Sequence, residues 1–172
     1  ERLSQLVNEA KDRILKEGTY FMEHVSAAPV TIPSMSSIIT SLYPFRSVTE
    51  DNTLFNLNPN VENYITKLRE IGYNAYATVP ESVALSRIPS LFVEGVESFP
   101  HTMTSYNGLG EQIIKKIKLG NLQGPWIYYV HLYDLYVGST FDIPEGESHK
   151  ILTDKKFGAN KYERVLSAMD EW

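Results

Sequence analysis

The sequence has no cysteine, no long apolar run and no excess of basic residues. There is no cysteine among its 172 residues, which excludes disulfide bonds and cysteine-based metal sites. No apolar run approaches the roughly 18 residues that a membrane-spanning helix needs. Basic residues are outnumbered, with 16 Lys and Arg against 21 Asp and Glu, for a net charge of −5. This balance argues against broad nucleic-acid binding, which leaves a basic footprint on a protein.

What is present has the composition and periodicity of one α/β domain. Hydrophobic residues make up 42% of the chain and charged residues 22%, which is ordinary for a globular domain. The spacing of apolar residues predicts helices over residues 1–17, 61–71, 108–119 and 162–172. Strand-like runs cover residues 19–25, 73–79 and 126–133. The last run is apolar on both faces, which predicts a central strand. The alternation of elements predicts a three-layer α/β fold, with a mostly parallel sheet between helices.

The remaining segments are predicted to be loops. Residues 47–60 are polar, and residues 137–158 combine polar residues with glycine and proline. Three prolines interrupt residues 80–106, where only a short strand near residues 91–93 is expected. The lysines of residues 115–118 are interpreted as a solvated face that complements a helix C-terminus.

Residues 27–44 are the most informative segment. Pro33 suits the first position of a helix, where its missing N–H costs nothing. Four apolar residues follow at the spacing i, i+3, i+4 and i+7 of a buried helical stripe, namely Met35, Ile38, Ile39 and Leu42. The unpaired N–H groups of such a helix start bind anions, and Thr31 stands beside them. A hydroxyl next to an anion site is what ester-transfer chemistry needs. The alternative is that Thr31 only caps the helix.

The same segment resembles a motif of the sulfatases and their relatives in the alkaline phosphatase superfamily. Its two pieces are residues 31–34 (Thr-Ile-Pro-Ser) and residues 40–44 (Thr-Ser-Leu-Tyr-Pro). Further pieces that resemble the family follow in the family's order at residues 15–21, 68–75, 126–134 and 162–172. Together they cover nearly the whole chain. The resemblance implies an alkaline phosphatase-like fold and places Thr31 at the position of the nucleophile.

The sequence also departs from the sulfatase pattern. Sulfatases convert a cysteine or serine to formylglycine, which a threonine cannot become, so Thr31 resembles the phosphodiesterase and phosphotransferase branches, whose hydroxyl itself attacks phosphorus. Met35 stands where sulfatases have an arginine. Residues 80–82 (Pro-Glu-Ser) stand where a sulfate-binding lysine and histidine are expected, and Tyr136 stands at the position of a second histidine.

The resemblance also implies a divalent metal, Zn, Mn, Ca or Mg. Only the oxygen of Thr31 would contact it from this chain, because the family's metal-binding Asp, His and Asn residues fall before residue 1 and after residue 172. The chain, residues 1–172, is therefore expected to be the middle piece of a single sulfatase-like domain with an incomplete sheet. Exposed sheet edges favour association, so the chain is expected to pair with a second copy or with the missing sequence.

Three further residues are candidates for substrate binding. The backbone N–H of Ser34 lies in the first turn of the expected helix and suits an anion. His131 and Asp134 follow the strongest strand, where the sites of doubly wound sheets gather. They are interpreted either as contacts to the substrate or leaving group, or as a buried histidine paired with a neighbour. Nearby tyrosines are interpreted as ordinary strand packing residues.

The sequence therefore predicts a hydrolase or transferase that acts on a small anionic ester of phosphate or sulfate, with Thr31 as the nucleophile. One alternative is a catalytically inactive fragment that serves as a scaffold or binding domain. Another is an unrelated α/β domain whose resemblance is coincidental, which would be indicated if residues 126–133 are not a central strand or if Thr31 does not lie at a strand-end cleft. Neither nucleic acid nor a transmembrane segment is expected.

Overall fold

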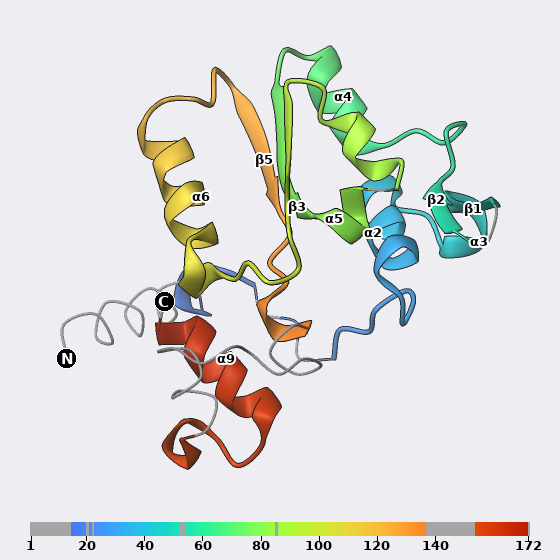
Figure 1. The fold of residues 1–172 in the computed structure, drawn as a ribbon. Coiled ribbons are helices and arrows are strands. Elements are labelled where there is room, and N and C mark those ends of the chain that lie inside the picture. Colours follow the sequence, from blue (N-terminus) through green and yellow to red (C-terminus); the bar gives the residue numbers. More distant parts are fainter. Residues whose placement is uncertain are drawn as a thin grey trace.

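The computed structural model describes residues 15–19, 21, 23–51, 54–84, 86–136 and 154–171. These residues form an α/β structure in which a three-stranded parallel sheet has helices on both sides (Figure 1). This confirms the predicted fold class at the level of a helix-flanked parallel sheet. Of the helix expected over residues 1–17, only residues 15–17 lie inside the described part, and they are helical. Of the loop expected over residues 137–158, residues 137–153 lie outside it.

The sheet has β3 (Asn74–Pro80) at its centre, with β4 (Gly95–Phe99) and β5 (Trp126–Val130) parallel to it on either side. Tyr76 is in register with Gly95 on one side and with Tyr128 on the other. The prediction that residues 126–133 form a central strand is therefore wrong, because β5 is an edge of the described sheet and ends at Val130. β5 is exposed at Trp126 and half-buried over its other residues, so its apolar pattern does not reflect burial on both faces. One of the two criteria for the family resemblance, a central strand at this place, is therefore not met within the described sheet.

One face of the sheet packs against α2 (Thr31–Thr40), α4 (Tyr64–Glu70) and α5 (Glu81–Ala84). β3 turns Ala75, Ala77 and Val79 into the apolar core on this side, and all three are fully buried. The small alanines let the helices approach the sheet closely. The core is completed by Met35, Ile39, Leu57, Ile65, Val83, Ile88 and Phe92.

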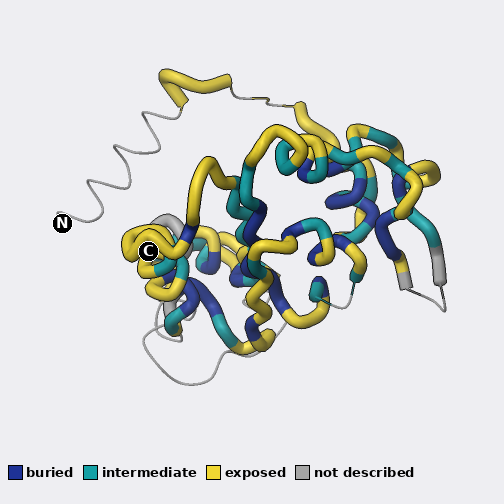
Figure 2. The backbone as a smooth tube through the Cα atoms, turned by 90° about the horizontal axis from the view of Figure 1, so that it is seen from above, coloured by how far each residue is buried: buried dark blue, intermediate teal, exposed yellow. Residues whose placement is uncertain are grey.

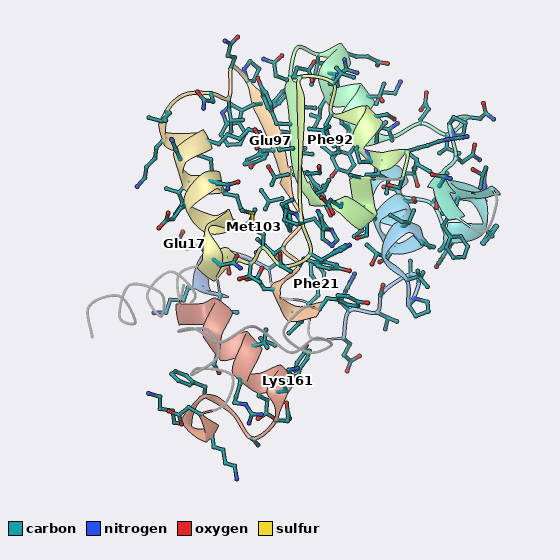
Figure 3. All side chains as sticks on the ribbon, viewed as in Figure 1. Glu17, Phe21, Phe92, Glu97, Met103 and Lys161 are labelled. Atoms are coloured by element: carbon teal, nitrogen blue, oxygen red, sulfur yellow. The ribbon has the colours of Figure 1, made fainter. Side chains whose placement is uncertain are left out.

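The other face of the sheet lies toward α6 (Leu109–Lys118). Lys116 of α6 reaches back to Glu97 of β4, with 3.0 Å between Nζ and Oε1. Its ammonium also lies over the rings of Tyr76 and Tyr128, 5.7 and 5.1 Å from their centroids. Lys116 is therefore not part of a solvated face, which corrects that prediction. Figure 3 shows Glu97 and Phe92 on opposite faces of the sheet.

The start of α2 differs from the prediction by two residues. Val30 is the N-cap residue and Thr31 is the first residue of the helix, so Pro33 stands third. Proline is tolerated there because the first four N–H groups of a helix have no partner within the helix. The buried face of α2 also differs from the predicted apolar stripe. Met35 and Ile39 are buried as expected, but Ile38 exposes 68% of its surface.

Several segments predicted to be loops contain short elements. Residues 47–60 hold the end of α3 (Pro44–Ser47) and a hairpin of β1 (Val48–Asp51) and β2 (Leu54–Leu57). Residues 80–106 hold α5, the 3₁₀ turns η1 (Ile88–Leu91) and η2 (Ser105–Asn107), and β4, which begins at Gly95 rather than near residue 91. Conversely, the described part of residues 19–25 forms no strand.

The remaining helices agree with the prediction. α4 and α6 lie within the expected ranges and are followed by Gly72 and Gly120, whose φ angles of 95° and 68° suit glycine. After η3 (Lys155–Phe157), α9 (Lys161–Glu171) is the last described helix. Val165 of α9 is buried, whereas Tyr162, Glu163 and Leu166 are exposed, and Figure 2 colours the described backbone by burial. Among the described residues, no helix combines the length and the apolar character that a membrane crossing requires.

Candidate functional site

A cleft of about 580 Å³ lies where α2 begins and where the chain leaves β5. Its walls come from four parts of the chain: the start of α2, α5, the segment after β5, and α9. The cleft thus brings together Thr31, Ser82, His131, Tyr133, Tyr136 and Tyr162. Thr31 and His131, both predicted from the sequence to be site residues, share this cleft although they lie far apart in the sequence.

Thr31 occupies an exposed position at the first residue of α2. Among the described residues, the backbone N–H groups of Thr31 and Ile32 have no hydrogen-bond acceptor. Pro33 has no N–H, and the N–H of Ser34 donates to the carbonyl of Val30 at 3.1 Å. No acidic residue stands in the first turn of α2. The helix dipole and the two N–H groups therefore favour an anion beside the Thr31 hydroxyl. The capping alternative for Thr31 is wrong, since Val30 holds the cap position.

His131 follows the last residue of β5 and extends the ladder, because its N–H donates to the carbonyl of Thr78 at 2.9 Å. Its side chain is half-buried, and Nδ1 lies 2.8 Å from the hydroxyl oxygen of Tyr129. Burial lowers the pKa of His131, so the imidazole is neutral near neutral pH. Nδ1 is occupied by Tyr129, so Nε2 is the ring nitrogen left to contact a ligand in the cleft.

Tyr129 connects His131 to the core and to α2. Its hydroxyl donates to Sδ of Met35 at 3.5 Å, and its ring stacks on Phe92 with 5.8 Å between centroids. Burial, assisted by the charge effect of Tyr64, raises the pKa of Tyr129 to about 12. Tyr129 therefore stays protonated at any ordinary pH. From the sequence, Tyr129 is interpreted as a packing residue. The signal for a link to His131 is that the two residues are two positions apart and share a side of the extended chain.

Ser34 and Asp134 do not line the cleft. The hydroxyl of Ser34 lies 2.9 Å from that of Ser26, which orders the segment before α2. Asp134 is only 3% exposed, and its Oδ1 accepts hydrogen bonds from the N–H of Ser105, at 2.7 Å, and from the hydroxyl of Ser105. Asp134 thus holds the 3₁₀ turn before α6, and its position next to His131 in the sequence does not bring it to the cleft.

Sequence reasoning missed the tyrosines that form much of the cleft wall. The rings of Tyr133 and Tyr136 are 4.7 Å apart, and Tyr133 also contacts His101, with 5.3 Å between centroids. Burial raises the pKa of Tyr133. Ser82 and Tyr136 stand at positions where the family resemblance predicts charged or imidazole side chains. They do line the cleft, as a hydroxyl and a phenol. The residues that line the cleft include no Lys, Arg, Asp or Glu.

The described residues do not form a metal site on their own. Within the described part of the chain there is no group of three or more His, Asp or Glu side chains that could hold a metal ion. In the cleft, His131 is the one ordinary metal ligand among the lining side chains, with the Thr31 hydroxyl beside it. Three or four such ligands are usual, so the described cleft residues do not hold a divalent metal by themselves, and the metal expected from the sequence resemblance stays a prediction.

Comparisons of this chain with protein-family models, with curated proteins and with solved structures gave no match.

Proposed function

We propose that this chain carries the nucleophile of a hydrolase or transferase that acts on phosphate or sulfate esters, in a fold of the alkaline phosphatase type. The observation that carries the proposal is that Thr31 and His131 share one cleft at the start of α2. The helix-flanked parallel sheet is compatible with that fold, and the sequence resemblance supports it.

The proposed step begins at the Thr31 hydroxyl. His131 accepts the hydroxyl proton on Nε2 while the Thr31 oxygen forms a bond to phosphorus or sulfur. The bond from that atom to the ester oxygen breaks, and the ester oxygen takes the proton back from Nε2. The N–H groups of Thr31 and Ile32 hold the non-bridging oxygens. Water or another acceptor then removes the group from Thr31 with His131 in the same role.

The rest of the cleft suits the organic part of such an ester. Its remaining lining side chains are aliphatic or tyrosines, apart from Ser82. With no cation in the lining, the anionic group is held by the helix N-terminus rather than by Lys or Arg. A small ester with one anionic group therefore fits the cleft better than a polyanion.

The test is turnover of p-nitrophenyl phosphate and p-nitrophenyl sulfate by wild type and Thr31→Ala, with acid-quenched samples examined for a modified Thr31 by mass spectrometry. We expect Thr31→Ala to lower kcat/KM at least about a hundredfold and to abolish the modified peptide, since the nucleophile is gone. Thr31→Ser retains a hydroxyl and should keep measurable activity.

Thr40→Ala is the matched control, because it removes a threonine hydroxyl from the other end of the same helix. Turnover in Thr31→Ala equal to that of wild type would refute the proposal.

A binding domain without turnover is the second candidate function. It is favoured by the lack, among the described residues, of a metal-binding group and by the lack of Lys or Arg in the cleft lining. Calorimetry with inorganic phosphate separates the two functions. Binding by both wild type and Thr31→Ala, with no turnover of either ester, would support this candidate.

A further inference from the structure

We propose that Tyr129 is a positioning residue that holds His131 in the tautomer whose Nε2 carries no proton. It does so by accepting a hydrogen bond from Nδ1–H of His131 while donating its own O–H to Sδ of Met35. The use of Nε2 as a base rests on the proposed function, but the tautomer itself does not.

The assignment follows from counting protons in the chain Met35–Tyr129–His131. The Tyr129 oxygen lies 3.5 Å from Sδ of Met35 and 2.8 Å from Nδ1 of His131. A thioether sulfur can only accept a hydrogen bond, and a phenol has a single proton to donate. Both contacts are hydrogen bonds at once only if the phenol proton points to Met35 and His131 donates from Nδ1. In the neutral imidazole, Nε2 is then the acceptor.

The surrounding residues hold the hydrogen-bonded series Met35–Tyr129–His131 in place. Tyr129 stacks on the fully buried Phe92, and Met35 belongs to the core cluster. The high pKa of Tyr129 excludes the phenolate, and burial keeps His131 neutral. Within the described part of the chain, the other titratable side chains in contact are Tyr133, whose ring is 6.3 Å from that of His131, and Tyr64, which acts on Tyr129. None of these carries a charge near neutral pH.

The two hydrogen bonds of Tyr129 also couple the two elements that form the cleft. Met35 lies one helical turn after Thr31 on α2, and His131 directly follows β5. One phenol oxygen therefore sets both the orientation of the imidazole and the spacing between the nucleophile helix and the strand that leads to the base. A shift of α2 would lengthen the contact to Sδ and free the phenol proton to turn toward His131.

The test is the tautomer and the pKa of His131, read from two-bond proton–nitrogen NMR correlations of the full chain. His131→Gln identifies the signal among the four histidines. We expect wild type to carry its proton on Nδ1 near neutral pH, against the preference of free histidine for Nε2–H. Tyr129→Phe removes the acceptor while keeping the ring, so it should lower the pKa of His131 further and move the proton to Nε2.

Two more variants sharpen the test. Met35→Leu removes the sulfur acceptor, so the phenol proton should turn to Nδ1 and also produce the Nε2–H form. Tyr128→Phe, the matched control, removes the neighbouring phenol, which bonds Thr78 on the other face, and should leave His131 unchanged. An Nε2–H form in wild type, or an unchanged His131 in Tyr129→Phe, would overturn the proposal.

Activity gives a separate readout. Tyr129→Phe should lower kcat for p-nitrophenyl phosphate about tenfold with KM little changed, and should move the acidic limb of the pH profile to lower pH. If the NMR results are as expected but Thr31→Ala retains full turnover, the proposed function fails and the positioning role of Tyr129 stands. If Thr31→Ala is inactive but His131 carries its proton on Nε2, the proposed function stands and the positioning role of Tyr129 fails.

Discussion

The two faces of the central sheet are built from the same strands yet differ in chemistry. Toward α2, α4 and α5 the sheet presents Ala75, Ala77 and Val79 to a core of apolar side chains. Toward α6 the neighbouring residues Tyr76 and Thr78 meet a lysine, a carboxylate and a second tyrosine. All five of these β3 residues are buried. Depth of burial in a strand therefore does not reveal which face contributes more to packing.

The face toward α6 is polar and more open to solvent. Thr78 hydrogen-bonds to the Tyr128 hydroxyl at 2.7 Å, and Lys116 bridges from α6 to Glu97. Glu97 keeps 59% of its side-chain surface exposed, so its ion pair with Lys116 is screened by water and contributes little to stability. Ile114 and Ile117 of α6 are also exposed. The apolar face is therefore expected to carry most of the stability.

The largest expected loss of stability comes from shortening a side chain in the apolar core. Ile65 is fully buried in the core, so Ile65→Ala should lower the free energy of unfolding by about 2–5 kcal/mol. Ile114→Ala is the matched change on α6, where the side chain is 41% exposed, and should cost less than about 1 kcal/mol. Urea unfolding monitored by circular dichroism measures both. Similar costs for the two variants would mean that the faces contribute equally.

A smaller effect is expected from the polar face. Lys116→Met keeps the length of the side chain but removes the ion pair with Glu97 and the contacts with two tyrosine rings. It should cost about 1 kcal/mol, and high salt should reduce that cost. Lys115→Met changes an exposed neighbour and should stay within about 0.5 kcal/mol of wild type. A cost of Lys116→Met that salt does not alter would show that packing rather than charge is responsible.

The smallest expected effect is a pH dependence of the free energy of unfolding. It arises from His131, whose partner Tyr129 packs against the apolar core. Burial lowers the folded-state pKa of His131 below the unfolded value of about 6.5, so the unfolded chain binds a proton more readily. The free energy of unfolding should therefore fall as the pH drops from about 6.5 toward the folded-state pKa, and should be level in this respect above 6.5. The measurement is urea unfolding at a series of pH values.

His131→Gln should flatten this slope, whereas His24→Gln, which changes an exposed histidine, should not. Glu94 loses its stabilising interactions at lower pH, because the N–H of Ala75 and the guanidinium of Arg69 hold its pKa below the usual range. Its effect on the free energy of unfolding therefore falls at lower pH than that of His131. An unchanged slope in His131→Gln would show that burial of the imidazole has no effect on folding.

The sequence predicted the helix-flanked parallel sheet and the placement of Thr31 at the start of a helix, because these features follow from local periodicity. It did not predict the hairpin at residues 48–57. Asn56 there looks like a loop residue, but it is buried and its Oδ1 accepts from the N–H of Arg87 at 3.2 Å, a contact made only in the folded chain. The edge position of β5 was missed because its residues are apolar or aromatic on both faces, although the strand is only partly buried.

The candidate site was predictable to the same extent. Thr31 and His131 were selected because each is expected at the end of an element, where sites gather, and the structure places both at one cleft. Tyr129 was not found, since its importance depends on contacts with residues of three other segments. Ser34 and Asp134 were selected for their neighbours in the sequence, but their side chains form hydrogen bonds with Ser26 and with Ser105 and do not line the cleft.

The strand pairing has a consequence for the order in which the chain assembles. Thr78 of β3 contacts Glu97 of β4 across 19 residues of sequence, but contacts Tyr128 of β5 across 50. Closing the longer loop costs more entropy, so we expect β3 and β4 to pair first, on the ribosome as well as in refolding. His131 reaches its place only when β5 docks. During synthesis α2 therefore exists for a time without His131 beside it. Under the proposed function, the Thr31 hydroxyl lacks its base until β5 is in place.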